Sequence, residues 1–137
     1  MSSAPAPAHW RNRAIHTSLD LAKICAQIAD GKKAEDILVL DVRTSPLTDY
    51  FVFCSGSNPK QLQAIAYEIE MRLKATGRRY YGREGYEVGR WVLMDYSDVV
   101  VHILHQDQRK HYDLERNWAD APRVEWKEEP LRKAVGE

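Results

Sequence analysis

The stretch FVFCSGSNPKQLQAIAYEIE, residues 51–70, decides the fold of this chain. An apolar run ends at Ser-Gly-Ser-Asn, residues 55–58, and a helical pattern follows directly. A strand, a glycine turn and a helix N-terminus in this order form the phosphate site of many proteins. The stretch therefore raises the question of whether the chain binds nucleotides or only shares the shape of proteins that do.

The overall composition indicates one globular domain with no net charge. The chain has 137 residues, of which 44% are hydrophobic and 29% are charged. Twenty basic residues balance twenty acidic ones. Because non-specific binding to nucleic acid depends on neutralising many phosphates, a chain without net charge is a poor candidate for it. We also expect no direct sequence-specific nucleic-acid binding. A protein partner that itself sits on RNA is compatible with this balance.

The sequence also predicts the compartment. Cys25 falls in a helical pattern and Cys54 in a strand pattern. The simplest interpretation is that both are free, buried thiols in a reducing cytosol. The N-terminal residues contain no apolar core of signal-peptide length, and the chain has no run of 18 apolar residues. We expect a cytoplasmic protein that does not enter a membrane.

Biased segments frame the predicted domain. Residues 1–16 are rich in Ala, Pro and Ser and predict a disordered arm. The mixed charges of residues 127–137 predict a mobile tail. Residues 17–126 between them form the predicted domain.

Apolar residues at intervals of three and four predict helices. The first helix follows a cap at Thr17 and ends at Gly31, and the second begins at Asn58 and ends at Gly77. A third helix is predicted over residues 105–118.

Short runs rich in branched and aromatic residues predict strands. These runs are residues 36–42, 50–55, 78–81, 90–94 and 98–104. The run over residues 50–55 is apolar on both faces, which predicts a central strand. The last two runs flank a turn near residues 95–97 and predict a hairpin, and residues 119–126 indicate an extended edge segment. We therefore expect an α/β domain with a mixed sheet of about five strands flanked by helices.

Nucleotidyl transfer is the first enzyme class to consider, because its active site opens with a Gly-Ser pair after a strand. This chemistry needs two carboxylates that flank one apolar residue on a strand and hold Mg²⁺ together. The spacing occurs at Glu68 and Glu70, but at ~100° per residue these lie about 200° apart around a helix. Asp95 and Asp98 lie across a turn, where Asp is favoured for its local hydrogen bonds. The sequence therefore predicts no catalytic carboxylate pair.

Other kinds of site have little support in the sequence. The turn at residues 55–58 has one glycine and no Walker lysine, so it is typical of helix capping rather than phosphate binding. His102, His105 and His111 lack the partners of a zinc site, and we expect one half-buried histidine and two on the surface. Cys54 lies inside a strand, and S-G-S is not the pattern of a nucleophile elbow. We expect no catalytic residue, no metal and no cofactor.

Surface recognition is the remaining function. Trp91 heads the hairpin strand beside Arg90, after a glycine-rich loop of mixed charge, residues 82–89. Large aromatic residues beside arginine dominate the hot spots of protein–protein interfaces. A tryptophan in a strand or an amphipathic helix is commonly a core residue instead. The residues leave both readings open for Trp91 and favour the core for Trp118.

Three segments together resemble one protein family. They are SPLTDYFVFCSGSNPKQLQAIAYEIE (45–70), EGYEVGRWVLMDYSDVVVHILHQDQRKHYDLERNW (84–118) and ADAP (119–122). They resemble the ribosomal silencing factor family, RsfS, also called Iojap-like, over about residues 17–122. The combination of T-D-Y-F-V, C-S-G-S, G-R-W-V-L-x-D-Y and Y-D-L-E-R-x-W is specific.

The resemblance implies a nucleotidyltransferase-like fold without the catalytic carboxylates. It implies a factor that binds the large ribosomal subunit through ribosomal protein fourteen, blocks joining of the subunits and represses translation under nutrient limitation. It implies no enzymatic activity, and homodimers within the family make self-association an expectation here. The alternative is a nucleotide-binding or nucleotidyltransferase-type enzyme on the same fold.

The resemblance also implies a docking surface on the hairpin strand and the loop before it. Its expected residues are Trp91, Asp95, Arg90, Glu84 and Gly85. Asp49 and Tyr50 match the family pattern as well, and either contact the partner or hold the sheet.

Overall fold

The strand predicted to be central is enclosed on both faces. In the computed structural model, which describes residues 15–127, β2 (Tyr50–Gly56) is buried at every residue. It pairs antiparallel with β1 (Glu35–Asp41) and parallel with β5 (Val99–His105). The predicted central position of this strand is confirmed.

Five strands form a mixed sheet in the order β1-β2-β5-β4-β3. β4 (Trp91–Asp95) pairs antiparallel with β5, as the predicted hairpin requires, and with the edge strand β3 (Gly82–Glu84). The predicted α/β fold with a mixed five-stranded sheet is confirmed. The nucleotidyltransferase likeness stays a prediction.

The third strand lies later in the chain than predicted. Residues 78–81 form no strand, because Arg78 still belongs to the end of the preceding helix: its amide donates to the Leu73 carbonyl at 2.9 Å. The Arg78 guanidinium also binds the Asp98 carboxylate at 2.9 Å. The Tyr81 amide makes the first hydrogen bond to β4, to the Asp95 carbonyl at 2.7 Å, and the strand itself begins at Gly82.

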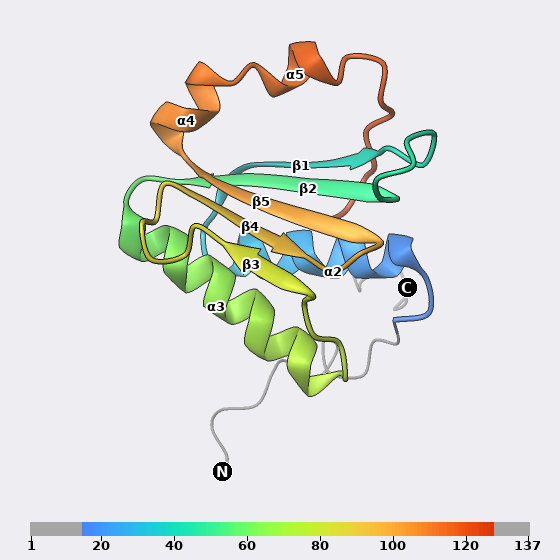
Figure 1. Ribbon diagram of the computed structural model, residues 1–137, viewed down its shortest axis with the longest axis horizontal. Helices are drawn as coiled ribbons and strands as arrows, with labels where there is room; N and C mark the ends of the chain where they lie inside the picture. The colour runs from blue at the N-terminus through green and yellow to red at the C-terminus, as the bar shows by residue number, and fades with distance from the viewer. Residues whose placement is uncertain (1–14, 128–137) are drawn as a thin grey trace, which may run out of the picture.

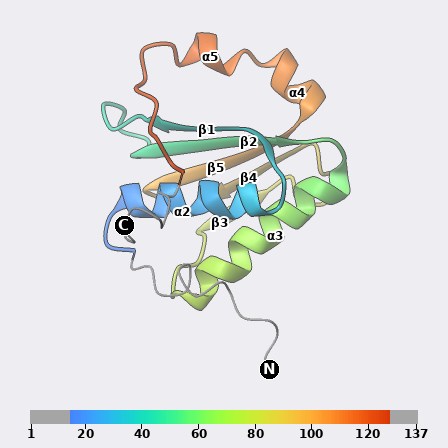
Figure 2. The same ribbon diagram turned by 180° about the vertical axis from the view of Figure 1, so that it is seen from behind.

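Two helices cover one face of the sheet (Figures 1 and 2). α2 (Ser18–Gly31) begins with a capping box between Thr17 and Asp20, and α3 (Pro59–Ala75) begins at the Asn58 cap. Their apolar stripes pack on the residues of the strands that point to this face. The main core contains Val39, Val52, Cys54, Val92, Met94, Val101 and Ile103 from the sheet.

The C-terminal part of the chain crosses to the other face. α4 (Gln106–His111) and α5 (Leu114–Asn117) lie over the β1 and β2 side of the sheet (Figures 1 and 2). The prediction of one helix over residues 105–118 is therefore wrong. Tyr112 is extended, and the Asp113 carboxylate starts a new helix by accepting the Arg116 amide at 3.2 Å.

After α5, the chain closes the outer edge of β1. The Asp41 amide donates to the Pro122 carbonyl and the Val124 amide donates to the Val39 carbonyl, both at 2.9 Å. We call residues 118–126 the C-terminal strap. Trp118 packs on the Phe51 side of the sheet, and Trp126 packs beside α2. The predicted extended edge segment is confirmed.

The predicted arm and tail fall mainly outside the described residues. Residues 1–14 and 128–137 are not among those that the structure describes. Within the described part, Ile15 packs against the main core and the His16 amide donates to the Asp20 carboxylate at 3.1 Å. No helix in residues 15–127 is long and apolar enough to cross a membrane.

The strap can be tested at one backbone group. Val124→Pro removes the N–H that binds the Val39 carbonyl, and we expect a loss of about 1 kcal/mol in the free energy of unfolding. Hydrogen exchange at the Asp41 amide should accelerate, since its acceptor Pro122 is on the same segment. Val124→Ala trims the side chain but keeps the N–H, so Asp41 should stay protected in it. Equal protection of Asp41 in both variants would contradict the pairing.

Candidate protein-docking face

The Gly-Ser turn at the start of α3 is occupied by helix capping. The Ser57 amide donates to Gln61 Oε1 at 2.8 Å, and the Gln61 amide donates to Asn58 Oδ1 at 2.9 Å. Gly56 allows a close approach, since a Cβ there would lie 2.8 Å from Leu62 Cδ1. The backbone donors that a phosphate would need are therefore used within the helix start, as the sequence predicts.

The carboxylates considered for catalysis lie far from this turn or are paired. Gly56 pairs with His105 and Asp95 pairs with Val100, so the two lie five residues apart along β5, or roughly 17 Å. Glu68 binds Arg72 and Glu70 binds Arg83, which separates the two glutamates as predicted.

Histidines and cysteines also form no reactive set in the described part of the chain. No three His, Cys, Asp or Glu side chains among residues 15–127 are grouped to hold a metal ion. Burial raises the pKa of the Cys54 thiol to about 12, and it also raises that of Cys25, so both stay protonated and inert. His102 and His105 are both half-buried, which corrects the prediction of a single half-buried histidine. His105 is covered because its Nδ1 accepts the Asp107 amide and caps α4.

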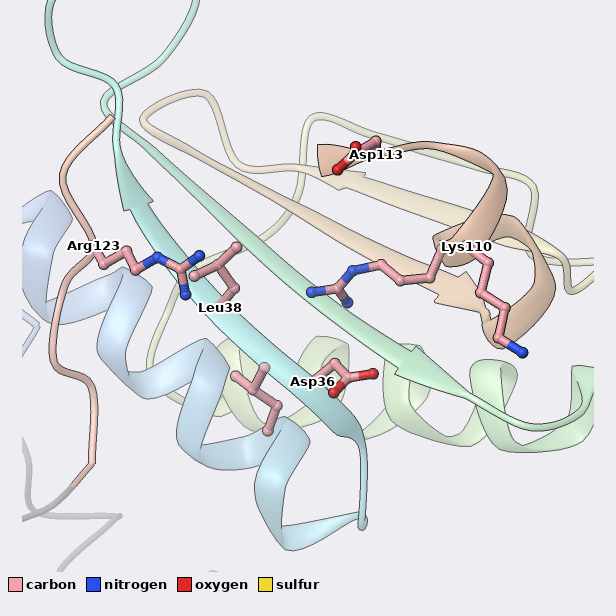
Figure 3. Close-up of a pocket in the computed structure, with 7 residues that line it drawn as sticks. Asp36, Leu38, Lys110, Asp113 and Arg123 are labelled. Atoms are coloured by element: carbon pink, nitrogen blue, oxygen red, sulfur yellow. The ribbon is translucent and has the colours of Figure 1, made fainter. Parts of the chain in front are cut away.

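A hollow of about 530 Å³ lies beside β1, between α4 and the strap. In Figure 3, Arg123 reaches over Leu38 from the strap, while Asp36 lies on β1. Its lining carries three basic and two acidic side chains, so opposite charges face the same space. Arg109 from this lining donates to the Ser55 hydroxyl at 2.9 Å. The mixed charge gives the hollow no clear preference for an anion or a cation.

The face of the sheet opposite α2 and α3 has a different character. Aromatic rings from three strands and from the segment above them are in contact there. We call this set the aromatic cluster; it consists of Phe51, Phe53, Trp91, His102, Tyr112 and Trp118. α4 and α5 cover the β1 and β2 side of this face, but the residues that β4 and β3 present to it are half-buried or exposed.

The predicted site residues from β4 and the edge strand β3 share this open half. Trp91, Leu93 and Asp95 alternate with the core residues of β4, and the pairing of Glu84 with Leu93 places the glutamate on the same face. Trp91 is half-buried, so it is neither a fully buried core residue nor a fully exposed one. The Asp95 carboxylate accepts the Ser97 amide at 2.7 Å and stays partly accessible. Trp91 and the two carboxylates therefore share one face of the sheet, with Leu93 between the indole and Asp95.

The remaining predicted site residues take part in turns and in backbone pairing. Gly85 has a φ of +80°, and a Cβ there would lie 2.0 Å from the Trp91 carbonyl oxygen, so the turn requires glycine. The Arg90 side chain is exposed, while its carbonyl accepts the His105 amide at 2.8 Å. Tyr50 is buried in the main core, and the Asp49 carbonyl accepts the Val42 amide at 2.9 Å. Asp49 and Tyr50 therefore hold the sheet.

Sequence reasoning missed the partners of Trp91. The indole Nε1 donates to His102 Nδ1 at 3.1 Å, and the Tyr112 ring packs edge-on against the indole with ring centroids 4.8 Å apart. Strand alternation could have placed Val100 and His102 on the same face as Trp91. Tyr112 had no such signal, because it was expected inside a continuous helix.

A glycine substitution tests the turn that carries the site. Gly85→Ala should lower the free energy of unfolding by more than about 1 kcal/mol, because alanine is strained at this positive φ and its Cβ meets the Trp91 carbonyl. Gly82→Ala on the same strand is the matched control, since no atom lies within 4 Å of its Cβ and its φ is ordinary. Urea unfolding of the two variants provides the comparison, and similar midpoints would contradict this geometry.

The burial of His102 predicts a pH dependence of stability. Burial lowers its pKa from 6.5 to about 4, so the unfolded chain binds this proton more readily than the folded chain. Stability should therefore fall as the pH drops from about 6.5 to about 4, by on the order of 1 kcal/mol per pH unit at most. His102→Asn lacks the titrating ring. The difference in the free energy of unfolding between the parent and this variant should therefore change with pH by this amount. A pH-independent difference would show that His102 titrates normally.

Comparison with known proteins places the chain in a family. The family described as "Ribosomal silencing factor during starvation" matches residues 15–136. "Ribosomal silencing factor RsfS" of Bacillus subtilis is 48% identical over 103 residues, which cover 74% of this chain and 87% of that protein. A mouse protein named "Mitochondrial assembly of ribosomal large subunit protein 1" is 33% identical over 91 residues, covering 64% of this chain and 40% of its own length.

A solved structure has the same fold. A crystal structure of a Bacillus halodurans protein superposes with a TM-score of 0.66 and 43% identity, covering 78% of this chain and 95% of that one. The chain therefore belongs to the family of ribosomal silencing factors, RsfS.

Proposed function

We propose that this protein binds the large ribosomal subunit through ribosomal protein fourteen and thereby keeps the small subunit from joining. The observation that carries the proposal is the shared exposure of Trp91, Asp95 and Glu84 on one open sheet face. Membership of the silencing-factor family and the large-subunit name of the mouse relative support the choice of partner. The protein acts in the cytoplasm and represses translation when nutrients are scarce.

The chemistry of the open face suits a basic protein surface. Glu84 pairs with Leu93, the residue midway between Trp91 and Asp95 on β4, so both carboxylates lie on the same sheet face as the indole. Aromatic anchors with charged rims are typical of interface hot spots. A specific contact buries roughly 800 Å² on each partner. Residues held on paired strands can enter such a contact without reordering of the backbone.

Silencing by this route is steric. The landing surface on the large subunit is one that the small subunit covers after joining, so the factor binds free large subunits and not assembled ribosomes. The factor stabilises the free subunit by RT ln(1 + [L]/Kd), which is ~2.7 kcal/mol at a hundredfold excess over Kd. Its effect rises with its own concentration and falls when small subunits are in excess.

Binding without turnover is part of the proposal. The Ser57 amide is engaged at the start of α3. Asp95, the catalytic candidate on β4, pairs with Val100, whereas Gly56 pairs with His105 at the opposite end of β5. These contacts support a docking module rather than the alternative, a nucleotidyltransferase-type enzyme. Self-association, which the resemblance implies, stays a prediction.

Variants of the open face test the proposed function. Trp91→Ala and Asp95→Arg should each weaken binding to purified large subunits by at least about tenfold, since a truncated anchor or a reversed charge at a desolvated contact removes one to several kcal/mol. Asp95→Asn keeps the oxygen that accepts the Ser97 amide, so it should weaken binding through charge alone. Co-sedimentation gives the affinity, and thermal unfolding shows whether each variant is folded.

A control and an order-of-addition assay complete the test. Tyr67→Ala removes an aromatic side chain, 52% exposed, from the outer side of α3 on the opposite layer, and should bind like the parent. In light scattering, the factor should inhibit joining when added before the small subunit and act only at the rate of spontaneous dissociation when added after it. Equal and rapid action in both orders would mean that the factor splits ribosomes, and the blocking mechanism would fail.

A further inference from the structure

His102 lies beneath the half-buried indole of Trp91. It sits on β5 and pairs directly across the sheet with Leu93, so the neighbouring Trp91 reaches it diagonally. The Phe53 ring stacks on the imidazole with centroids 4.9 Å apart, and the Phe51 ring meets it edge-on at 5.2 Å. The imidazole is therefore fixed from below by two aromatic rings of the central strand.

The hydrogen bond from the indole fixes the state of this histidine. Trp91 Nε1 donates to His102 Nδ1 at 3.1 Å, which requires Nδ1 without a proton and leaves the ring proton on Nε2. The apolar surroundings keep the ring neutral and able to accept. An indole N–H that lost this acceptor in a partly buried site would be left unsatisfied, which is costly.

Tyr112 closes the other side of the indole. Its ring packs edge-on against Trp91, with centroids 4.8 Å apart, at the break between α4 and α5. The indole is thus held by a hydrogen bond on one side and by a ring on the other. Its polar N–H points into the protein, so the accessible part of the ring is apolar.

We propose that His102 is a positioning residue that locks the Trp91 indole, with its N–H turned inward, in the orientation required for docking. This inference rests on the proposed function, in which Trp91 is the anchor of the interface. A preordered anchor loses less rotational freedom on binding than a mobile one, and this raises affinity without a new contact. His102 acts through Trp91 and needs no contact with the partner.

Two variants distinguish the effect of losing the His102 ring from the effect of losing its hydrogen-bond acceptor. His102→Phe keeps an aromatic ring between Phe53 and Trp91 but removes the acceptor, whereas His102→Asn can place an amide oxygen near the position of Nδ1. We expect His102→Phe to weaken binding to purified large subunits by up to about tenfold, which is the order of the cost of immobilising one free side chain on binding. His102→Asn should restore most of the affinity, although it lacks the ring.

A double-mutant cycle shows whether the effect passes through the indole. Trp91→Phe removes the donor, so His102→Phe should cause no further loss of affinity in that background. An equal loss in both backgrounds would overturn the proposal, because His102 would then act independently of Trp91. Higher affinity of His102→Phe than of His102→Asn would also overturn it, because the ring alone would then be sufficient.

A second readout does not depend on the ribosome. In ¹H–¹⁵N spectra, the indole N–H signal that disappears in Trp91→Phe should exchange slowly with water in the parent and in His102→Asn, and rapidly in His102→Phe. If the parent does not bind large subunits, the proposed function fails, and this exchange pattern alone decides whether His102 holds the indole. Rapid exchange in the parent would overturn the positioning role even if binding is observed.

Discussion

The burial of β2 on both faces is the constraint on which the rest of the structure depends. A strand that shows no side to solvent must be covered twice, and its parallel pairing with β5 requires a long connection between the two. α3 is part of that connection and covers one face together with α2. The second face has to be covered by chain that follows β5, and α4, α5 and the strap supply this cover.

The second cover is incomplete, and this leaves open the proposed docking face. α4 and α5 are short and lie over the β1 and β2 side of the sheet, so β4 keeps its aromatic and acidic side chains partly exposed. The same rings that fill the covered half continue under Trp91. The core and the proposed interface therefore form one continuous layer, which gives the half-buried Trp91 the rigidity of the interior.

The sequence predicted those elements that are encoded by local periodicity. The capped helices, the apolar strand β2 and the hairpin turn each have a short-range sequence pattern, and the structure has these elements where the pattern predicts them. The errors arose where distant residues decide: Arg78 is held by Asp98 from the hairpin, and Tyr112 leaves the helix to pack on Trp91. Neither contact has a signal in the surrounding sequence.

The site was predictable to a similar degree. Resemblance to the family pointed to Trp91, Asp95 and Glu84, and strand register brings them to one face. For Gly85 the resemblance implied a contact, whereas the backbone geometry requires glycine at that turn. The hydrogen bond between Trp91 and His102 depends on which residues of two strands are diagonal neighbours, and that register cannot be read from either strand alone.

Covering β1 with the chain's own strap also limits how the sheet can grow. Residues 122–124 pair with residues 39–41 of β1, and β3 at the opposite edge of the sheet is a strand of only three residues. Covered or short edges leave few backbone groups free to pair with another chain. Both features therefore protect the fold against the open-ended stacking by which exposed sheets form fibres.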